Sequence, residues 1–305
     1  MPYLLLVLAT IFWGGNYVVG KILVFHLPPV LIAEIRWTLV AILLVALYHR
    51  KVKNDWQEIK GSLRSLSFLA LFGQVLFPLN LYIGLQYTTP LNAAIFLSAT
   101  PSMVLLINKF IFKDVISKAN VLGVLLSTGG VLYLLVASSF QQRSQVGFLN
   151  EGDLWAIGSA ICWAFYCSFL RIKNKKISGN SFVTMCAVLG ACFLIPIVLL
   201  SGSLSVTEVG AIHLNFTIIA GMFYSVVFPS WLSYLFWSKG IGEIGATRGE
   251  IYTHLIPLFG GIFSIWFLGN KLHMYHLISA VLIFSGIYFC SIHEQLKKKR
   301  LTFRS

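Results

Sequence analysis

Ten long apolar runs alternate with short polar connections along this chain of 305 residues. Each run is long enough to cross a bilayer as a helix, because about 20 apolar residues span the hydrocarbon core. The predicted spans of the first half are residues 3–22, 28–48, 66–86, 91–111 and 118–138. Those of the second half are residues 153–171, 181–201, 215–237, 246–268 and 273–292. The pattern therefore predicts an all-α integral membrane protein with ten transmembrane helices.

The two halves of the chain repeat each other. The segment FWGGNYVVGK around Trp13 matches CWAFYCSFLR around Trp163 at a shift of 150 residues. At a shift of 156 residues, Gly84, Ile95, Pro101 and Gly130 match Gly240, Ile251, Pro257 and Gly286. Since each half holds five spans, the second half must enter the bilayer with the opposite orientation. We expect two inverted five-helix repeats, residues 1–140 and 150–293, and a basic tail, 294–305. Inverted repeats are typical of secondary transporters.

Composition argues against a soluble protein. Hydrophobic residues make up 57% of the chain and charged residues only 11%, whereas a soluble domain carries about 25% charged residues. The net charge of +13 does not indicate nucleic acid binding, because the basic residues fall in short clusters between apolar runs. With the N-terminus in the cytosol, 17 of the 23 Lys and Arg residues lie on the cytosolic side. Both termini are therefore predicted to be cytosolic, and the tail QLKKKR is expected to contact membrane lipid.

The chain shows no pattern of a cofactor, a metal site or an enzyme. Its five cysteines lie in apolar runs without metal-binding spacing, so we predict neither a disulfide nor a metal site. No GxxxxGK[ST] loop, GxSxG motif or HExxH motif occurs, which argues against ATP drive and against hydrolysis. His273 and His276, three residues apart, are too little for a metal site. We therefore expect a protein that needs no cofactor and is not an enzyme.

Several segments together resemble a known family. They are IFWGGNYVVGK in the first span, LPPVLIAEIRW in the second, the proline-centred fourth and ninth spans, and TGGVLYLL and FSGIYF in the fifth and tenth. The chain resembles EamA-like permeases of the drug/metabolite transporter (DMT) superfamily over almost its whole length. The resemblance implies ten helices, a cavity between the halves and transport of small organic solutes across a bacterial cytoplasmic membrane. Lys113-Asp114 and Gly269-Asn270 stand where the family usually has Gly-Glu.

Aromatic and amide residues are the candidate solute-binding groups. In the resembled family the first, third, fourth, sixth, eighth and ninth helices line the cavity. The candidates on these helices are Trp13, Asn16, Tyr17, Asn80, Tyr82, Trp163, Tyr166, Trp231 and Tyr234. Spacings of three or four residues place Trp13 with Tyr17, Trp163 with Tyr166, and Trp231 with Tyr234 on shared helix faces. Two alternatives stay open: aromatic residues also form belts at the bilayer surface, and buried amides also join helices.

Charged residues inside the spans are the candidates for coupling or gating: Arg36, Arg248, Glu250 and His254. A charge at mid-membrane is costly, so it is expected to face protein or water. Glu250 and His254 are four residues apart, and in an α-helix they could share a proton. Two other interpretations stay open. Arg248 and Glu250 could reach the nearby cytosolic surface, and Arg36 could brace neighbouring helices.

These observations predict a secondary transporter for a small organic solute, an amino acid, an amine or a related metabolite, which it exports by alternating access. A lipid-linked metabolite flippase or a nucleotide-sugar carrier on the same fold is the main alternative. An intramembrane enzyme is a remote one. The expected partners are the solute and membrane lipid, without nucleic acid, and a homodimer is left open.

Overall fold

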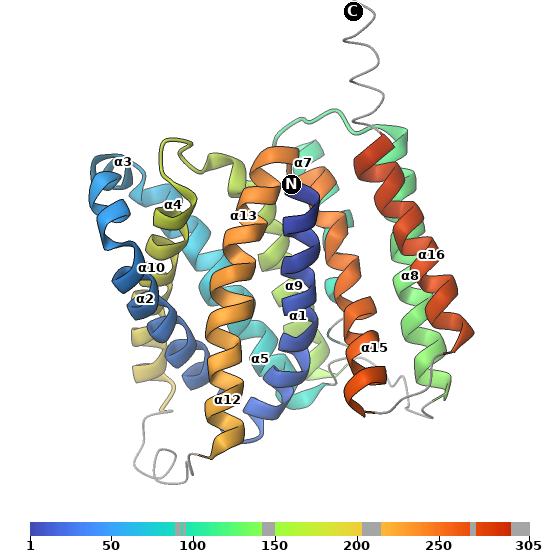
Figure 1. Cartoon of the computed structure of the whole chain (residues 1–305), viewed down its shortest axis with the longest axis horizontal. Coiled ribbons are helices and arrows are strands. Elements are labelled where there is room, and N and C mark those ends of the chain that lie inside the picture. Colours follow the sequence, from blue (N-terminus) through green and yellow to red (C-terminus); the bar gives the residue numbers. More distant parts are fainter. Residues whose placement is uncertain (89–92, 94–95, 142–149, 203–214, 269–272, 294–305) are drawn as a thin grey trace, which may run out of the picture.

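The helices of the computed structural model run between two opposite ends of the molecule, and their connections lie at those ends (Figure 1). The structure describes residues 1–88, 93, 96–141, 150–202, 215–268 and 273–293. The predicted basic tail, the Gly269-Asn270 pair and most of the connection between the halves lie outside these residues.

The first half of the chain contains one helix for each predicted span and a short additional helix, α3. Its helical segments are α1 (Pro2–Val24), α2 (Pro29–Asn54), α3 (Trp56–Gly61), α4 (Leu63–Ala70), the π-helix η1 (Leu71–Leu76), α5 (Phe77–Tyr87), α7 (Thr100–Phe110) and α8 (Lys118–Gln141). The segments α4, η1 and α5 follow one another without a break and form a single membrane-crossing rod. The predicted spans thus agree with the observed helices to within a few residues, apart from the fourth.

The second half follows the same order. Its helical segments are α9 (Glu151–Phe169), the 3₁₀-helix η2 (Leu170–Ile172), α10 (Gly179–Leu200), α12 (Phe216–Ser225), the π-helix η3 (Val226–Leu232), α13 (Ser233–Ile244), α14 (Ala246–Gly249), the 3₁₀-helix η4 (Glu250–His254), α15 (Leu255–Leu268), α16 (Met274–Ile287) and the π-helix η5 (Tyr288–His293). Again one rod, α12–η3–α13, contains a π-helical turn near its middle.

Eight helices within the described residues are long and apolar enough to cross a membrane. They correspond to all the predicted spans except the fourth and the ninth. Part of the fourth, residues 91–92 and 94–95, lies outside the described residues, and α7 alone has 11 residues. The ninth is divided into α14, η4 and α15. The chain is therefore an all-helical integral membrane protein.

Proline accounts for both interruptions of the long rods. Pro78 is the second residue of α5, two positions after the end of η1, and Pro229 lies inside η3. A proline has no N–H to donate, and its ring excludes the carbonyl four residues earlier, so the helix widens locally. The hydroxyls of Ser230 in η3 and of Ser233, the first residue of α13, donate to the carbonyls five residues before them, at 2.5 and 3.0 Å. These serines satisfy carbonyls of the widened turn.

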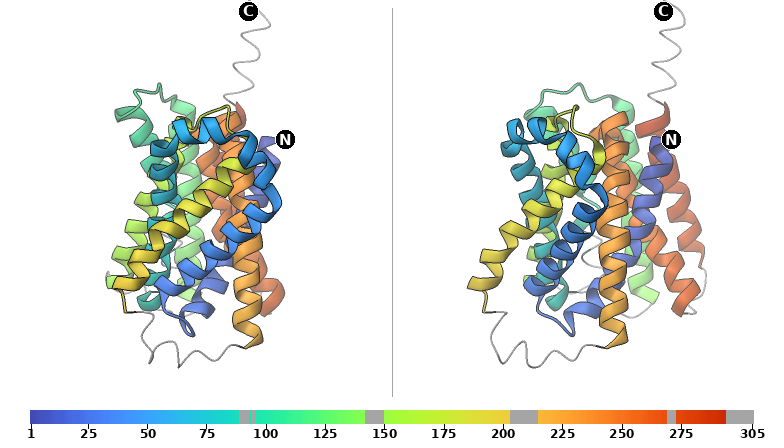
Figure 2. Two further views of the ribbon diagram at one scale, coloured as in Figure 1. Left: turned by 90° about the vertical axis from the view of Figure 1, so that its left-hand side faces the viewer. Right: turned by 60° about the vertical axis from the view of Figure 1, so that its left-hand side comes forward.

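The principal helix contacts join one half of the chain to the other. Helix α2 packs against α10, and α8 packs against α16 at one flank of the molecule (Figure 1 and Figure 2). Helix α1 packs against α13 and α15, while α9 packs against α5 and α7. Each half is therefore completed by the other, and the central side chains come from both.

Large apolar side chains cover much of the outer surface. Examples are Ile42, Leu125, Ile195, Leu199, Ile219 and Val281, each more than 45% exposed. In water such a surface would cause aggregation. In a bilayer the lipid tails solvate it, and the polar side chains turn inward instead.

Candidate functional site

A cluster of aromatic rings fills the centre of the molecule, and we call it the aromatic centre. Its members are Trp13 of α1, Trp37 of α2, Phe77 of α5, Trp163 and Tyr166 of α9, and Tyr234 and Trp237 of α13. The Trp13 ring centroid lies 5.0 Å from those of Trp163 and Trp237. Except for Phe77, every member is at most 7% exposed. The predicted residues Trp13, Trp163, Tyr166 and Tyr234 therefore do come together.

Hydrogen bonds fix two of these rings against helix backbones. The Trp13 indole donates to the carbonyl of Pro229 at 2.9 Å, and the Tyr234 hydroxyl donates to the carbonyl of Gly73 at 2.5 Å. Both acceptors lie in the π-helical turns η3 and η1. The widened turns thus supply the carbonyls that orient two central rings, one from each half of the chain.

The two hollows described on the surface lie away from the aromatic centre. One hollow, of about 310 Å³, is lined by residues that include Val45 and Trp56. The other, of about 300 Å³, is lined by residues that include Lys118 and Leu125. No member of the aromatic centre lines either of them.

Arg36 is a buried cation beside the aromatic centre. It is 3% exposed, its Nε donates to Ser230 of η3, and its Nη1 donates to the hydroxyl of Tyr82 at 2.6 Å. Its guanidinium carbon lies 5.5 Å from the Trp37 ring and 5.9 Å from the Tyr82 ring. The ion pairs of the described residues, Arg171–Asp114 and Lys176–Glu58, do not include it. A lone charge at mid-membrane costs at least about 2.5–3.5 kcal/mol on insertion scales.

Glu250 lies on another side of the aromatic centre. It is fully buried, and its Oε1 accepts a hydrogen bond from the indole of Trp163 at 3.0 Å. Its Oε2 has no nitrogen or oxygen partner among the described residues, and the weakly donating thiol of Cys167 lies beside the carboxyl. The prediction left open that Glu250 reaches the cytosolic surface, and its complete burial contradicts that alternative.

The expected direct pairing of Glu250 with His254 is not formed. His254 Nδ1 lies 2.5 Å from the Ser127 hydroxyl, and its Nε2 lies 2.8 Å from the carbonyl of Ser98. Both residues belong to the 3₁₀-helix η4. With about three residues per turn, groups four apart point in different directions, whereas in an α-helix they would share a face. The carboxyl therefore faces α9 while the imidazole faces α8.

The other polar candidates lie around the aromatic centre without joining its rings. The Asn80 amide contacts the Cys162 thiol across α5 and α9, at 3.7 Å, as expected for a helix-joining amide. Asn16 and Tyr17 are buried in α1. The Asn16 Oδ1 and the Tyr17 hydroxyl have no partner among the described residues.

Two predicted residues lie elsewhere. Trp231 is half-buried and its ring packs near Tyr48, at 6.3 Å, so it does not share a face with Tyr234. The cause is the π-helical turn η3, which ends at Leu232 between them and changes the angle per residue. Arg248 is half-buried in α14, with no hydrogen bond or ion pair to the described part of the chain.

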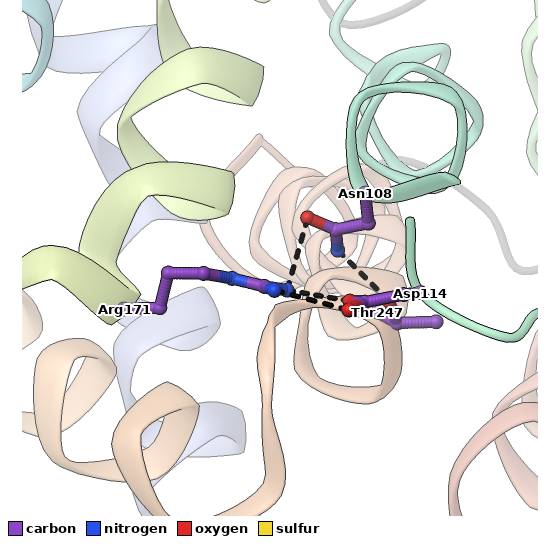
Figure 3. A network of polar contacts seen from close by, with 4 residues as sticks. All are labelled: Asn108, Asp114, Arg171 and Thr247. Atoms are coloured by element: carbon purple, nitrogen blue, oxygen red, sulfur yellow. Dashed lines mark hydrogen bonds and ion pairs between the residues drawn. The ribbon is translucent and has the colours of Figure 1, made fainter. Parts of the chain in front are cut away.

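At the end of the molecule near the N-terminus, four polar residues connect three segments, and we call them the Arg171 network (Figure 3). Arg171 of η2 binds both carboxylate oxygens of Asp114, at 2.6 and 3.1 Å, and donates to the Asn108 amide oxygen at 3.3 Å. The Asn108 amide donates to Thr247 of α14 at 2.8 Å. Lys113 has φ 54°, a left-handed turn that directs Asp114 back toward Arg171. Glycine adopts this conformation without cost, whereas a lysine does not.

A second polar cluster lies at the opposite end. The Lys21 ammonium donates to the carbonyls of Leu85 and Thr88, at 2.6 and 3.1 Å. The Thr88 hydroxyl donates to Asp153 at 2.7 Å, and Asp153 takes part in the capping box of α9. This cluster joins the ends of α1, α5 and α9, so polar contacts hold helices of both halves together at each end.

No group of three or more metal-binding side chains occurs in the described ranges. His273 and His276 have a local structural role, because the imidazole of His276 accepts a hydrogen bond from the His273 backbone N–H at 3.1 Å, at the start of α16.

Sequence patterns did not single out several residues of the site. Trp37, Phe77, Ser230 and Thr247 contribute to the aromatic centre, to the contacts of Arg36 or to the Arg171 network. Trp37 could have been found, since it directly follows the buried Arg36 in the chain. Ser230 and Thr247 could not, because serine and threonine are common in membrane helices and only their contacts distinguish them.

Buried charged and aromatic groups at the centre of an all-helical membrane protein are typical of a solute pathway, and a solute transporter is the class that this fold and site favour. The profile of the EamA-like transporter family matches residues 1–136 and again residues 150–292. "Uncharacterized transporter YyaM" of Bacillus subtilis (strain 168) is 28% identical over 95% of this chain and 93% of its own length. The "Probable amino-acid metabolite efflux pump" of Salmonella typhimurium (strain LT2) is 28% identical over 93% of this chain and 92% of its own length.

This chain belongs to the EamA-like transporter family, within the DMT superfamily. The prediction of a transporter, not an enzyme, is confirmed by this membership. A solved crystal structure with 17% sequence identity covers 98% of both chains with a TM-score of 0.72, which shows a common fold.

Proposed function

We propose that this protein is a secondary transporter that exports amino acids, amines or related metabolites from a bacterial cell by alternating access. The observation that carries the proposal is the aromatic centre, built from both halves of the chain and flanked by the buried guanidinium of Arg36 and the buried carboxyl of Glu250. Ring faces, a guanidinium and a carboxyl suit a small zwitterion or amine. The Salmonella relative's name, an amino-acid metabolite efflux pump, supports the same solute class.

The proposed architecture is ten transmembrane helices in two inverted repeats, 1–140 and 150–293, with a basic tail, 294–305. The helix contacts support it, because α1 packs on α13 and α15 as its counterpart α9 packs on α5 and α7. The close crossings also correspond. A Cβ on Gly84 would lie 2.9 Å from the Gly152 carbonyl oxygen, and one on Gly240 would lie 3.3 Å from that of Pro2. The π-helical turns η1 and η3 occupy matching rods.

We further propose that both termini are cytosolic. Figure 1 places α3, which carries Lys60, at the same end as the N-terminus. The Lys176 ammonium lies 3.3 Å from the Glu58 carboxylate of α3, so the connection after η2 reaches this end too. Basic residues of both halves thus gather at one end, as the excess of Lys and Arg in cytosolic loops requires.

In this orientation the Arg171 network closes the cytosolic end, and the cluster around Lys21 closes the outer end. Transport would break each in turn as the halves rock around the centre. Because α7, η2 and α14 meet at Arg171, separating them would open a path from the cytosol toward Trp163 on α9.

Counterflow in liposomes tests the function. Purified protein in liposomes loaded with an unlabelled amino acid or amine should accumulate the labelled solute from outside. If no member of a broad amino-acid and amine panel moves, the proposed solute class is wrong. In the same assay we predict that Glu250→Gln, which keeps the acceptor for Trp163, removes the pH dependence of transport. Unchanged pH dependence would exclude Glu250 from coupling.

A further inference from the structure

We propose that Arg36 binds the carboxylate of the transported solute, so that the protein selects carboxylate-bearing metabolites over the corresponding amides and amines. This inference rests on the proposed function and narrows its solute class. It starts from the absence of an anion for Arg36 among the described residues, as both of its hydrogen-bond partners are neutral hydroxyls.

The acid nearest to Arg36 in the chain does not pair with it. Glu34 lies two residues away in α2, and such positions are on different faces of an α-helix. Its Oε1 instead accepts a hydrogen bond from Thr38 at 2.7 Å. The Glu250 carboxyl accepts from Trp163. No carboxylate of the described chain is therefore bonded to Arg36.

The surroundings of Arg36 can receive an anion. A guanidinium has five N–H donors in a planar fork that matches a carboxylate. Its hydrogen bonds within the described chain use Nε, directed at Ser230, and Nη1, directed at Tyr82. The Tyr82 hydroxyl accepts from Arg36 and keeps its own proton, which it can donate to an anion. The hydroxyl proton of Ser230 is already used on the Ser225 carbonyl at 2.5 Å.

The position of Arg36 is suited to a solute that also contacts the rings. Ser230 follows Pro229, whose carbonyl holds the Trp13 indole, and Trp37 packs edge-on to Tyr234 at 5.3 Å. A carboxylate at Arg36 would place the remainder of the solute toward these rings. If Arg36 only held neighbouring helices together, its bonds to the two hydroxyls would be sufficient. The protein would then bind an acid and its amide equally tightly.

The experiment compares phenylalanine, phenylalaninamide and phenethylamine, and repeats the acid–amide comparison with leucine and tryptophan. Binding is measured from the rise in unfolding temperature of the full-length protein in detergent, and transport from competition in liposome counterflow. Wild-type protein should bind the acid at least tenfold more tightly than its amide. Arg36→Gln should remove this preference, while Lys109→Gln, which neutralises an exposed cation of α7, should keep it.

Arg36→Lys keeps the positive charge but lacks the planar fork of N–H donors. It is the test variant if Arg36→Gln does not fold. It should weaken binding of the acid several-fold and leave binding of the amide unchanged. Equal effects on acid and amide would overturn the inference, as would an unchanged preference in Arg36→Gln. If wild-type protein transports the amines or amides at the same rate as the acids, the inference fails and the proposed function stands. If nothing moves, both fail.

Discussion

Removing the charge of Asp114 should loosen the proposed cytosolic end. Asp114→Asn keeps the size and one acceptor of the side chain but removes the bidentate ion pair with Arg171, whose two bonds measure 2.6 and 3.1 Å. The bonds between Asn108 and Thr247 and between Arg171 and Asn108 remain available. The variant therefore tests the ion pair alone.

The expected magnitude is modest. The two side chains are 37% and 34% exposed, so solvent screens their attraction. Pairs at such exposure contribute up to about 1 kcal/mol. Because 1.4 kcal/mol corresponds to a factor of ten, the ratio of open to closed molecules should rise about fivefold at most.

Thiol labelling can measure this ratio. Cys167 is fully buried and lies four residues before Arg171, one helical turn deeper along α9. In a variant that retains Cys167 as its single cysteine, a maleimide should react with Cys167 only when the end of the molecule that carries the Arg171 network opens. Asp114→Asn should raise the labelling rate up to about fivefold.

Lys176→Gln is the matched control. It removes the other ion pair of this end, Lys176–Glu58, which joins α3 to the connection between η2 and α10 and does not involve Arg171. Its labelling rate should equal that of the parent. The reasoning is refuted if Asp114→Asn leaves the rate unchanged, or if Lys176→Gln raises it as much.

Two further predictions concern stability. Burial raises the pKa of Asp55, but hydrogen bonds from Ser181 and Ser178 outweigh it and lower the pKa below its ordinary value. The carboxylate therefore stabilises the fold above pH of about 4 and loses this effect as the pH falls through the lower folded pKa. Asp55→Asn should lower the unfolding temperature at pH 7, and this difference should shrink as the pH falls below about 4. A difference that stays constant with pH would contradict this. Gly286→Ala should destabilise by about 1–3 kcal/mol, because its Cβ would lie 2.5 Å from the Gly123 carbonyl oxygen and 2.7 Å from the Ser127 nitrogen. Gly129→Ala, with nothing within 4 Å of the added carbon, should not, and equal unfolding temperatures would refute the packing argument.

Local sequence was a good guide within the regular α-helix α9. The pairing of Trp163 with Tyr166, three residues apart in α9, is present with ring centroids 5.1 Å apart. The same spacing failed for Trp231 and Tyr234, because η3 lies before Tyr234 and has a different angle per residue. The four-residue spacing of Glu250 and His254 failed in η4 for the same reason.

The sequence by itself determined the class of protein and the approximate bounds of eight of the predicted spans. Lipid requires long apolar segments whose backbone groups are satisfied within each helix, so the length of each segment is written in its own residues. The tertiary structure decided which polar groups meet. Arg36 contacts Ser230 from 194 positions away, and Trp163 contacts Glu250 from 87 positions away. Such partners depend on how helices of the two halves pack and on where their turns widen or tighten, and neither property belongs to any single segment.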